Sequence, residues 1–423
     1  MGKRRWIIFS AIFISYWLPF FDRNLTSPAL PLIIEDWNLS MAQAGIIATV
    51  MLFTYAFGQL PAGYLADRYG RRVLLIMGSG SIAVLNLLLG SAHSFVSFIA
   101  VRLVFGLAAA WNLGPSMALV RDWIPMHLRG LAFSFLGFAT TLGPLLALFW
   151  GRAILADHHW SYIFTYAALP SVLALVLIWT LVRDAKPSDR EAVREEEARA
   201  AGRPLETAPP AEETGAGASF GWATYKTAFT DYRLWAIYLA WALIVGEFYV
   251  VLHFLPTFLV TYHGMELGSA VAVSTSWLWV GLAVSIPGGW LSDRLRSRKW
   301  FTCLVSVWAS VIVLLLPLFP LKILTPVLGL MGVFWFSTTG AFYAWCSEVS
   351  ERVSPAIVAT VLSTASLFGQ LGGAGGTYLA GLLADAYGQG FLMLSAGMAG
   401  VLSVVVLFAF LPETFSGRAG VNK

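Results

Sequence analysis

The sequence predicts an all-α membrane protein in which twelve transmembrane helices form two six-helix, pseudo-symmetric bundles. The first observation is composition: 58% of the 423 residues are apolar and only 12% are charged, whereas a soluble domain carries about 25% charged residues. The second is a series of long apolar runs, and the third is a segment that occurs twice at a fixed separation. The net charge of +4 does not indicate nucleic-acid binding, because most basic residues lie between apolar runs on one predicted side of a membrane.

Twelve apolar runs have the ~20 residues that a helix needs to cross a hydrocarbon core. They lie near residues 6–30, 43–66, 73–91, 95–120, 130–152, 160–182, 233–261, 269–291, 301–319, 324–347, 355–384 and 390–411. With the N-terminus inside, most of the 27 Lys and Arg residues fall in cytoplasmic segments. The positive-inside rule therefore predicts a multi-pass protein of the cell (inner) membrane with both termini in the cytoplasm.

The predicted organisation has three parts: an N-terminal six-helix bundle over residues 1–182, a cytoplasmic linker over 183–232 and a C-terminal six-helix bundle over 233–423. Residues 183–219 are rich in Glu, Arg, Ala, Pro and Gly, so they can bury little apolar surface. We expect a tether there, part of which could be a charged helix. The glycine-rich segment 369–376 predicts close helix packing rather than a phosphate-binding loop.

The segment Pro61–Arg72 groups glycine and charged residues between two apolar runs, and it recurs as Pro287–Arg294. Matching residues are separated by 226 positions: Gly63 and Gly289, Asp67 and Asp293, Gly114 and Gly340, and Gly143 and Gly369. A constant separation indicates an internal duplication. Charged side chains could bridge neighbouring helix ends, although a basic loop that only sets topology would also explain the arginines. The predicted conformational gate comprises Gly63, Asp67, Arg68, Arg71, Arg72, Gly289, Asp293 and Arg294.

Ionisable residues interrupt three of the predicted spans. Asp22 and Arg23 lie in the first, Arg102 in the fourth and Glu247 in the seventh. With a rise of ~1.5 Å per residue, Asp22, Arg102 and Glu247 lie ~8, ~9 and ~10 Å below the outer membrane edge. A charge at this depth costs at least ~2.5 kcal/mol, so it must be paired or face water. Their common layer is the strongest functional signal in the sequence.

Two interpretations of this layer stay open. Asp22 could simply neutralise Arg102, while Arg23 extends toward the outer surface. A single aspartate cannot neutralise two arginines, however, and an arginine fork is suited to bidentate binding of a carboxylate. On the first span, Tyr16, Phe20 and Arg23 follow helical spacing and share a face. The second interpretation predicts an anion-binding surface.

Aromatic residues of the seventh and tenth spans could stack on an apolar or aromatic acid, although such residues are also ordinary in membrane proteins. They are Tyr249, Trp335, Phe342, Tyr343 and Trp345. The predicted substrate-binding residues are Arg23, Arg102, Tyr16, Phe20, Tyr249, Trp335 and Tyr343. Asp22 and Glu247 are the predicted proton-coupling residues.

Two groups of motifs carry a resemblance to known transporters. Residues 63–72, G-x-x-x-D-R-x-G-R-R, resemble the signature of the major facilitator superfamily. Asp22-Arg23-Asn24-Leu25-Thr26 and Arg102-x-x-x-Gly106 resemble its anion:cation symporter family, which includes sugar-acid and sialin-like carriers. The resemblance implies that Arg23 and Arg102 bind the substrate anion and that Asp22 is a proton site. That family usually has a glutamate seven residues after the second arginine, where this chain has Ala109.

These observations predict a secondary carrier that moves an organic anion, and in particular a carboxylate, together with protons. The substrate would lie between the bundles, lined by spans one, four, seven and ten. One alternative is a proton-antiport exporter of amphiphilic or drug-like compounds, which Gly143-Pro144 weakly indicates, and another is a ligand sensor. An enzyme is not expected, because the sequence has no nucleophile–base pair or metal-ligand set. We expect no cofactor, metal or nucleic-acid partner; the partners are a small organic anion, protons and the lipid bilayer, and the protein is a monomer.

Overall fold

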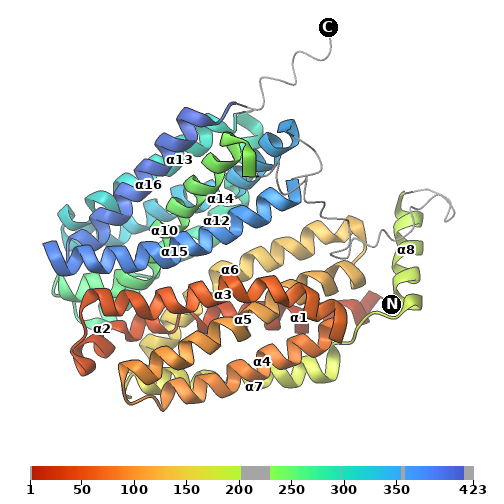
Figure 1. Cartoon of the computed structure of the whole chain (residues 1–423), viewed down its shortest axis with the longest axis horizontal. Coiled ribbons are helices and arrows are strands. Elements are labelled where there is room, and N and C mark those ends of the chain that lie inside the picture. The colour runs from red at the N-terminus through yellow and green to blue at the C-terminus, as the bar shows by residue number, and fades with distance from the viewer. Residues whose placement is uncertain (1, 202–228, 296, 354–357, 414–423) are drawn as a thin grey trace, which may run out of the picture. The chain divides into compact units, whose positions relative to one another are not determined.

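The computed structural model describes residues 2–201, 229–295, 297–353 and 358–413 (Figure 1). These residues form helices connected by short loops, with no strand among them. The helices of the first half are α1 (Gly2–Asp22), α2 (Thr26–Trp37), α3 (Met41–Tyr69), α4 (Arg71–Gly90), α5 (Phe95–Trp123), α6 (Met126–Leu155) and α7 (Ser161–Leu181). They are followed by α8 (Pro187–Ala201), α10 (Tyr232–Thr261), α11 (Leu267–Val273), α12 (Ser276–Leu295), α13 (Lys299–Leu315), α14 (Leu321–Val353), α15 (Val358–Tyr387) and α16 (Phe391–Phe410).

The predicted all-α membrane fold is confirmed. Within the described ranges, 10 helical segments are long and apolar enough to cross a membrane. The helices α1 and α15 occupy the two remaining positions at which the sequence predicts a span. The repeat is also visible in the helix boundaries, because α5 begins at Phe95 and α14 begins at Leu321, the predicted 226 residues later.

Two predicted spans each consist of two helices, a detail that the apolar runs do not indicate. The first predicted span, 6–30, is interrupted at residues 23–25, between α1 and α2. Pro28 lies in the first turn of α2, where it has no N–H to donate and its ring would clash with the carbonyl of Asn24 in a continuous helix. The eighth, 269–291, is interrupted at Ser274 and Thr275, whose hydroxyls donate to the carbonyls of preceding residues at 2.8 and 2.7 Å.

By its internal contacts the chain forms two compact units. Unit 1 consists of Met1–Leu25, Thr54–Ala147 and Asp157–Ser219, and unit 2 of Thr26–Phe53, Leu148–Ala156 and Phe220–Lys423. The units therefore do not follow the order of the chain, because α2 and the first half of α3 group with the C-terminal helices. The division of the chain into bundles at residues 183–232 stays a prediction.

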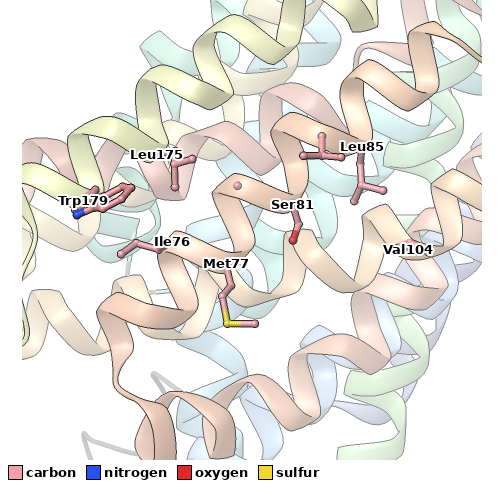
Figure 2. Close-up of a pocket in the computed structure, with 9 residues that line it drawn as sticks. Ile76, Met77, Ser81, Leu85, Val104, Leu175 and Trp179 are labelled. Carbon is pink, nitrogen blue, oxygen red and sulfur yellow. The ribbon is translucent and has the colours of Figure 1, made fainter.

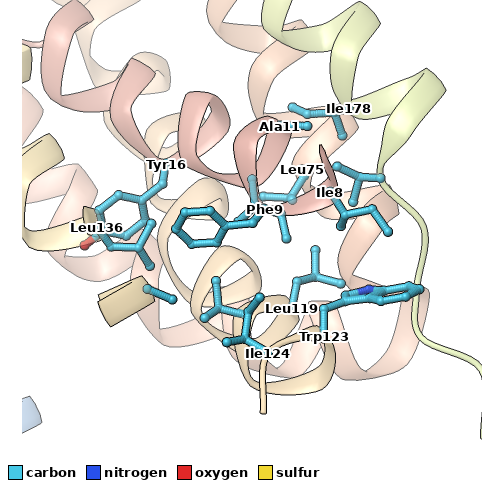
Figure 3. Close-up of a cluster of buried hydrophobic side chains, with 14 of the residues drawn as sticks. Ile8, Phe9, Ala11, Tyr16, Leu75, Leu119, Trp123, Ile124, Leu136 and Ile178 are labelled. Atoms are coloured by element: carbon cyan, nitrogen blue, oxygen red, sulfur yellow. The ribbon is translucent and has the colours of Figure 1, made fainter. Parts of the chain in front are cut away.

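The core of unit 1 is a cluster of buried apolar side chains around α1 (Figure 3). Phe9 and Tyr16 of α1 belong to it, together with Leu119 and Trp123 of α5 and Ile178 of α7. Helix α1 packs closely against α6 at Gly143. A Cβ added at this glycine would lie 2.6 Å from the Cβ of Phe20. Inside a membrane such contacts act through van der Waals packing rather than through release of water.

In unit 2, close packing of α15 on α10 depends on glycine. A Cβ at Gly372 would lie 2.0 Å from the carbonyl oxygen of Ala242, and one at Gly376 would lie 3.0 Å from the Cα of Gly246. Any larger side chain would therefore push the two helices apart. The predicted role of the glycine-rich segment in helix packing is confirmed.

Helix α2 and the first half of α3 are attached to unit 2 by polar contacts as well. The Asp385 carboxylate at the end of α15 accepts hydrogen bonds from the backbone N–H groups of Met41 (2.7 Å) and Ala42 (2.8 Å), the first residues of α3. It therefore satisfies donors that have no partner within the helix and lies at the positive end of the helix dipole. The Ser27 hydroxyl of α2 donates to the Leu252 carbonyl of α10 at 2.6 Å.

Part of the expected tether is an ordered helix. Within α8, Glu196 receives two hydrogen bonds from Arg5 of α1, at 2.9 and 2.8 Å. Just before α8, Arg183 pairs with Asp189 at 2.9 Å, and its backbone carbonyl accepts a hydrogen bond from the Trp123 indole at 3.1 Å. The alternative of a charged helix thus holds for Pro187–Ala201, and residues 202–228 of the expected tether lie outside the described part of the chain.

Candidate functional site

The centre of the candidate site is Asp22, the last residue of α1, which is 1% exposed. Its Oδ1 accepts a hydrogen bond of 2.8 Å from the Asn86 amide of α4. The Asn86 amide is also 3.3 Å from the Ser171 hydroxyl of α7. Three helices therefore fix the position of the carboxylate within unit 1.

Arg102 supplies positive charge to Asp22 from α5. This helix begins after Ser94, whose hydroxyl caps it by accepting from the Ser97 N–H at 3.3 Å. Two turns further along, Arg102 is 1% exposed, and its charge attracts that of Asp22. The attraction between the two charges supports the interpretation in which Asp22 balances Arg102, which stays a prediction.

Aromatic rings surround the Arg102 guanidinium. Its Cζ lies 5.4 Å from the ring centroid of Phe98, 5.8 Å from that of Phe164 and 6.0 Å from that of Phe105. Cations are attracted to the faces of such rings, with a gain of about 2 kcal/mol when water is excluded. The rings hold the guanidinium in place without neutralising its charge.

Arg23 follows Asp22 in the turn between α1 and α2 and is 6% exposed. Its Cζ lies 4.4 Å from the ring centroid of Phe20 and 5.6 Å from that of Tyr55 on α3. The rings of Tyr16 and Phe20 are 5.4 Å apart. Tyr16, Phe20 and Arg23 therefore form one continuous cluster, and their role in binding substrate stays a prediction.

A second polar cluster in unit 1 was not found from the sequence. The Asn112 side-chain oxygen on α5 accepts hydrogen bonds from Ser15 of α1 (2.9 Å) and Ser79 of α4 (3.0 Å). Asn86 was missed as well. Both asparagines interrupt apolar runs, and a buried amide in a predicted span is the signal that could have identified them.

Glu247 lies on α10 in unit 2 and is 2% exposed. Asp231 caps the start of this helix by accepting from the Arg233 N–H at 2.8 Å. The Glu247 Oε2 accepts a hydrogen bond of 2.8 Å from the Ser310 hydroxyl of α13. Since Asp22 and Arg102 belong to unit 1, the common layer expected for these residues stays a prediction.

Two of the predicted aromatic residues in unit 2 stack on neighbouring rings. Trp335 stacks on Phe248 with ring centroids 4.4 Å apart. Tyr249 stacks on His253 at 5.8 Å, and its hydroxyl donates to Gln370 at 3.3 Å. These contacts use one face of each ring, so they do not by themselves assign either residue to a substrate.

The remaining aromatic candidates of α14 pack close to one another. Phe342 is fully buried and stacks on Trp241 at 4.5 Å, and Tyr343 meets the edge of the same Trp241 at 4.9 Å. The Trp345 indole donates to the Pro412 carbonyl at 2.9 Å. Phe342 and Trp345 are buried and Tyr343 is partly exposed, and the role of all three in substrate binding stays a prediction.

The predicted gate is described only in part. Gly70, between α3 and α4, has a φ of 96°, a conformation that favours glycine. Next to it, Arg71 pairs with Asp122 of α5, and Arg72 donates to the Trp179 carbonyl at the end of α7 at 2.6 Å. These arginines therefore join the ends of α4, α5 and α7 within unit 1.

The other predicted gate residues lie on α3 and α12. Arg68 and Arg294 are exposed. For Gly63, Asp67, Gly289 and Asp293 the structure describes only the helical backbone. Their proposed role in the gate stays a prediction.

A groove of about 510 Å³ lies on unit 1 between α4, α5 and α7 (Figure 2). Its lining is apolar and includes exposed side chains such as Met77, Val104 and Trp179. None of the predicted site residues lines it. Because its helices are long enough to span a membrane, this surface is suited to contact with lipid tails rather than with an anion.

Residues 12–377 match the sequence model of the Major Facilitator Superfamily. The chain belongs to this superfamily. One relative that aligns with nearly the whole chain is a cis,cis-muconate transport protein of Acinetobacter baylyi. It is 24% identical over 403 residues, which cover 94% of this chain and 92% of the relative. A probable 4-methylmuconolactone transporter of Cupriavidus pinatubonensis is 27% identical over 418 residues, covering 96% of this chain and 90% of the relative.

Solved structures support the fold. The crystal structure of a bacterial homolog to the human lysosomal transporter Spinster, in an inward-facing and unoccupied conformation, has a TM-score of 0.76 and 19% sequence identity. It covers 96% of this chain and 95% of that chain. Membership of the Major Facilitator Superfamily, predicted from residues 63–72, is therefore confirmed, and with it a multi-pass membrane transporter rather than an enzyme.

Proposed function

We propose that this member of the superfamily is a secondary active transporter that carries an organic anion, specifically a carboxylate, in symport with protons. The observation that carries the proposal is the charge of the buried site in unit 1. Within its membrane-spanning part, the buried charged residues that the structure describes are Asp22, Arg23 and Arg102. One carboxylate and two guanidiniums leave one positive charge, and a proton on Asp22 would leave two, so the site attracts an anion in either state.

The site also offers chemistry that suits a carboxylate. Arginine can bind both oxygens of a carboxylate through two parallel N–H donors. Phe20 and Tyr16 lie beside Arg23 and provide apolar surface for the rest of the substrate. Transport of cis,cis-muconate, the anion of a dicarboxylic acid, by a relative that aligns over nearly the whole chain supports this substrate class.

Proton coupling follows from competition for Arg102. While Asp22 is ionised it attracts the Arg102 guanidinium, and a proton on Asp22 would release that charge for the substrate. When substrate and proton leave together, Asp22 again balances Arg102. Asn86 would hold the Asp22 carboxyl group in place through both steps. The inner-membrane location, the cytoplasmic termini and the monomeric state belong to the same proposal.

The exporter alternative receives no specific support. Its only sequence indication was Gly143-Pro144, and the glycine has a structural reason in the close packing of α6 on Phe20. The contributions of Tyr249, Trp335 and Tyr343 to substrate binding stay predictions, as does a second proton site at Glu247.

The test is uptake of labelled cis,cis-muconate into proteoliposomes under an inward proton gradient. Arg23→Lys keeps the charge but removes the two-pronged donor, so we expect a loss of most uptake. Arg152→Lys, at an exposed position of α6, is the matched control and should transport normally. Normal uptake by correctly folded Arg23→Lys protein would contradict the proposed role of Arg23 in binding the substrate.

The same vesicles test proton coupling. Asp22→Asn should abolish accumulation driven by the proton gradient, while exchange of labelled for unlabelled substrate continues. Accumulation by this variant under a proton gradient alone would show that another residue carries the proton. If wild-type protein moves no carboxylate from a panel of mono- and dicarboxylates, the substrate class itself is wrong.

A further inference from the structure

Unit 2 contains a small cavity next to Glu247. It is lined by Ile244 and Glu247 of α10, Ser306 and Ser310 of α13, and Trp335 and Thr338 of α14. Its volume of about 10 Å³ leaves room for a single group of the size of a water molecule. Four of its six lining side chains carry oxygen.

The hydroxyl protons around this cavity are already used. Ser310 donates to Glu247 Oε2 at 2.8 Å, Ser306 donates to Thr338 Oγ1 at 3.3 Å, and Thr338 donates to the Phe334 carbonyl at 3.1 Å. A hydroxyl has one proton and two lone pairs. The oxygens therefore offer acceptors to the cavity and no remaining donor.

The carboxylate adds a negative charge to this set of acceptors. Among the described residues, no hydrogen-bond donor reaches Glu247 Oε1, and no Lys, Arg or His forms an ion pair with Glu247. Glu247 is also the one titratable side chain in the cavity lining. A buried carboxylate needs a positive partner or a proton, because its desolvation is otherwise uncompensated.

A glycine on a fourth helix makes this arrangement possible. A Cβ at Gly400 of α16 would lie 2.0 Å from Glu247 Oε2 and 2.2 Å from the Ser310 oxygen. The backbone of α16 thus closes one side of the pair, and any other residue would displace the carboxylate. The site is therefore formed by four helices, α10, α13, α14 and α16, whose side chains and backbone fit closely around the carboxylate.

We propose that this cavity binds a sodium ion. Hard cations prefer oxygen ligands, and the carboxylate and three hydroxyls supply them, with the hydroxyl protons already donated to other acceptors. A single carboxylate matches a single positive charge, and the described residues contain no group of three or more His, Cys, Asp and Glu side chains that would hold a multivalent metal. The one-water volume fits sodium better than the larger potassium ion.

A role of the cavity in coupling rests on the proposed symport, to which sodium would add a second cation. Sodium binding itself does not depend on the proposed symport, so the test uses no substrate. Failure of sodium binding would leave carboxylate transport intact, and failure of carboxylate transport would leave the cavity and its ion unchanged.

The experiment measures thermal unfolding of the purified full-length protein in lipid nanodiscs, with sodium replacing choline at constant ionic strength. A ligand that binds only the folded state raises the unfolding midpoint with the logarithm of its concentration. We expect a rise of several degrees with sodium that continues with the logarithm of its concentration above the dissociation constant, and a much smaller rise with potassium. Glu247→Gln should abolish this rise, and Ser310→Ala and Thr338→Val should each shift the sodium dependence at least tenfold to higher concentration.

Two matched variants serve as controls. Ser337→Ala removes the neighbouring hydroxyl, which donates to the Val333 carbonyl outside the cavity, and should keep the sodium response. Asp22→Asn removes the buried carboxylate of unit 1 and should also keep it. An equal sodium response in wild type, Glu247→Gln and Thr338→Val would overturn the proposal. So would stabilisation by acidification alone, lost in Glu247→Gln, because the occupant would then be a proton.

Discussion

The buried carboxylates of α1 and α10 differ in what neutralises them. Asp22 ends α1 and accepts a hydrogen bond from Asn86 of α4, and Glu247 of α10 accepts one from Ser310 of α13. In the repeat these helices correspond, α10 to α1 and α13 to α4. Asp22 has the guanidinium of Arg102 on α5, whereas α14, the equivalent of α5, contributes the Thr338 hydroxyl beside Glu247.

On the two proposals above, this difference gives the halves of a duplicated scaffold different functions. Both halves use the first helix to place a carboxylate and the third to hold it. Where the fourth helix supplies a fixed cation, the pair can exchange partners with an anionic substrate. Where it supplies hydroxyls, the positive charge must come from solution. The nature of the counter-charge thus separates an anion site from a cation site.

The largest expected effect tests the fixed cation. Arg102→Met leaves Asp22 buried without its counter-charge, and breaking a buried pair in this way costs about 3–5 kcal/mol. We expect a large fall in the thermal midpoint that the double variant with Asp22→Asn largely restores. Glu247→Gln removes no internal pair and should lower the midpoint far less, measured without sodium. A double variant as unstable as Arg102→Met would contradict the pairing.

The next effect is on the driving force. One proton with one monoanion carries no net charge, so membrane potential should contribute little in sodium-free buffer. With a sodium ion bound at Glu247 one charge enters, and the potential adds about 2.3 kcal/mol per 100 mV. The measurement is accumulation of a monocarboxylate in proteoliposomes, with the membrane potential set by potassium and valinomycin. We expect an inside-negative potential to increase this accumulation only when sodium is present.

Glu247→Gln should remove this response while uptake driven by the proton gradient persists. A steep dependence on potential in sodium-free buffer would instead indicate a second proton. If Glu247→Gln removed that dependence too, Glu247 would be its site, as the sequence analysis allowed.

The smallest effect concerns the room that glycine makes for the Glu247–Ser310 pair. Gly400→Ala would overpack it, and overpacking costs about 1–3 kcal/mol. We expect a moderate fall in thermal midpoint together with loss of the sodium response. Gly375→Ala is the matched control, because no atom lies within 4 Å of a Cβ added there. Equal effects of the two substitutions would show that the cavity does not depend on Gly400.

Some parts of the site could be predicted from the sequence because they violate a strong rule. A charge inside an apolar run is costly, so Asp22, Arg102 and Glu247 were identified before the fold was known. The neutral partners were not. An amide or hydroxyl costs much less to bury when it is hydrogen-bonded, so Asn86 and Ser310 did not stand out among similar residues.

The fold could likewise be predicted only in part from the sequence. Length and hydropathy give the spans, and the 226-residue repeat gives their grouping. They do not reveal the interruption at residues 23–25, because the apolar run resumes at Leu25 and only Pro28 indicates that the helix breaks. Nor could composition show that Glu196 of the charged segment pairs with Arg5, a contact across 191 residues.

The Asp385 cap on α3 has a consequence for the order in which the protein assembles. Its carboxylate and the Met41 N–H are 344 residues apart in the chain. At about 5–20 residues per second, synthesis of that interval takes roughly 20 seconds to a minute. Throughout this time the beginning of α3 lacks its cap, and Ser27 waits for α10. The beginning of α3 is therefore capped only after α15, one of the last helices, has left the ribosome, and a truncated N-terminal half would be released without this cap.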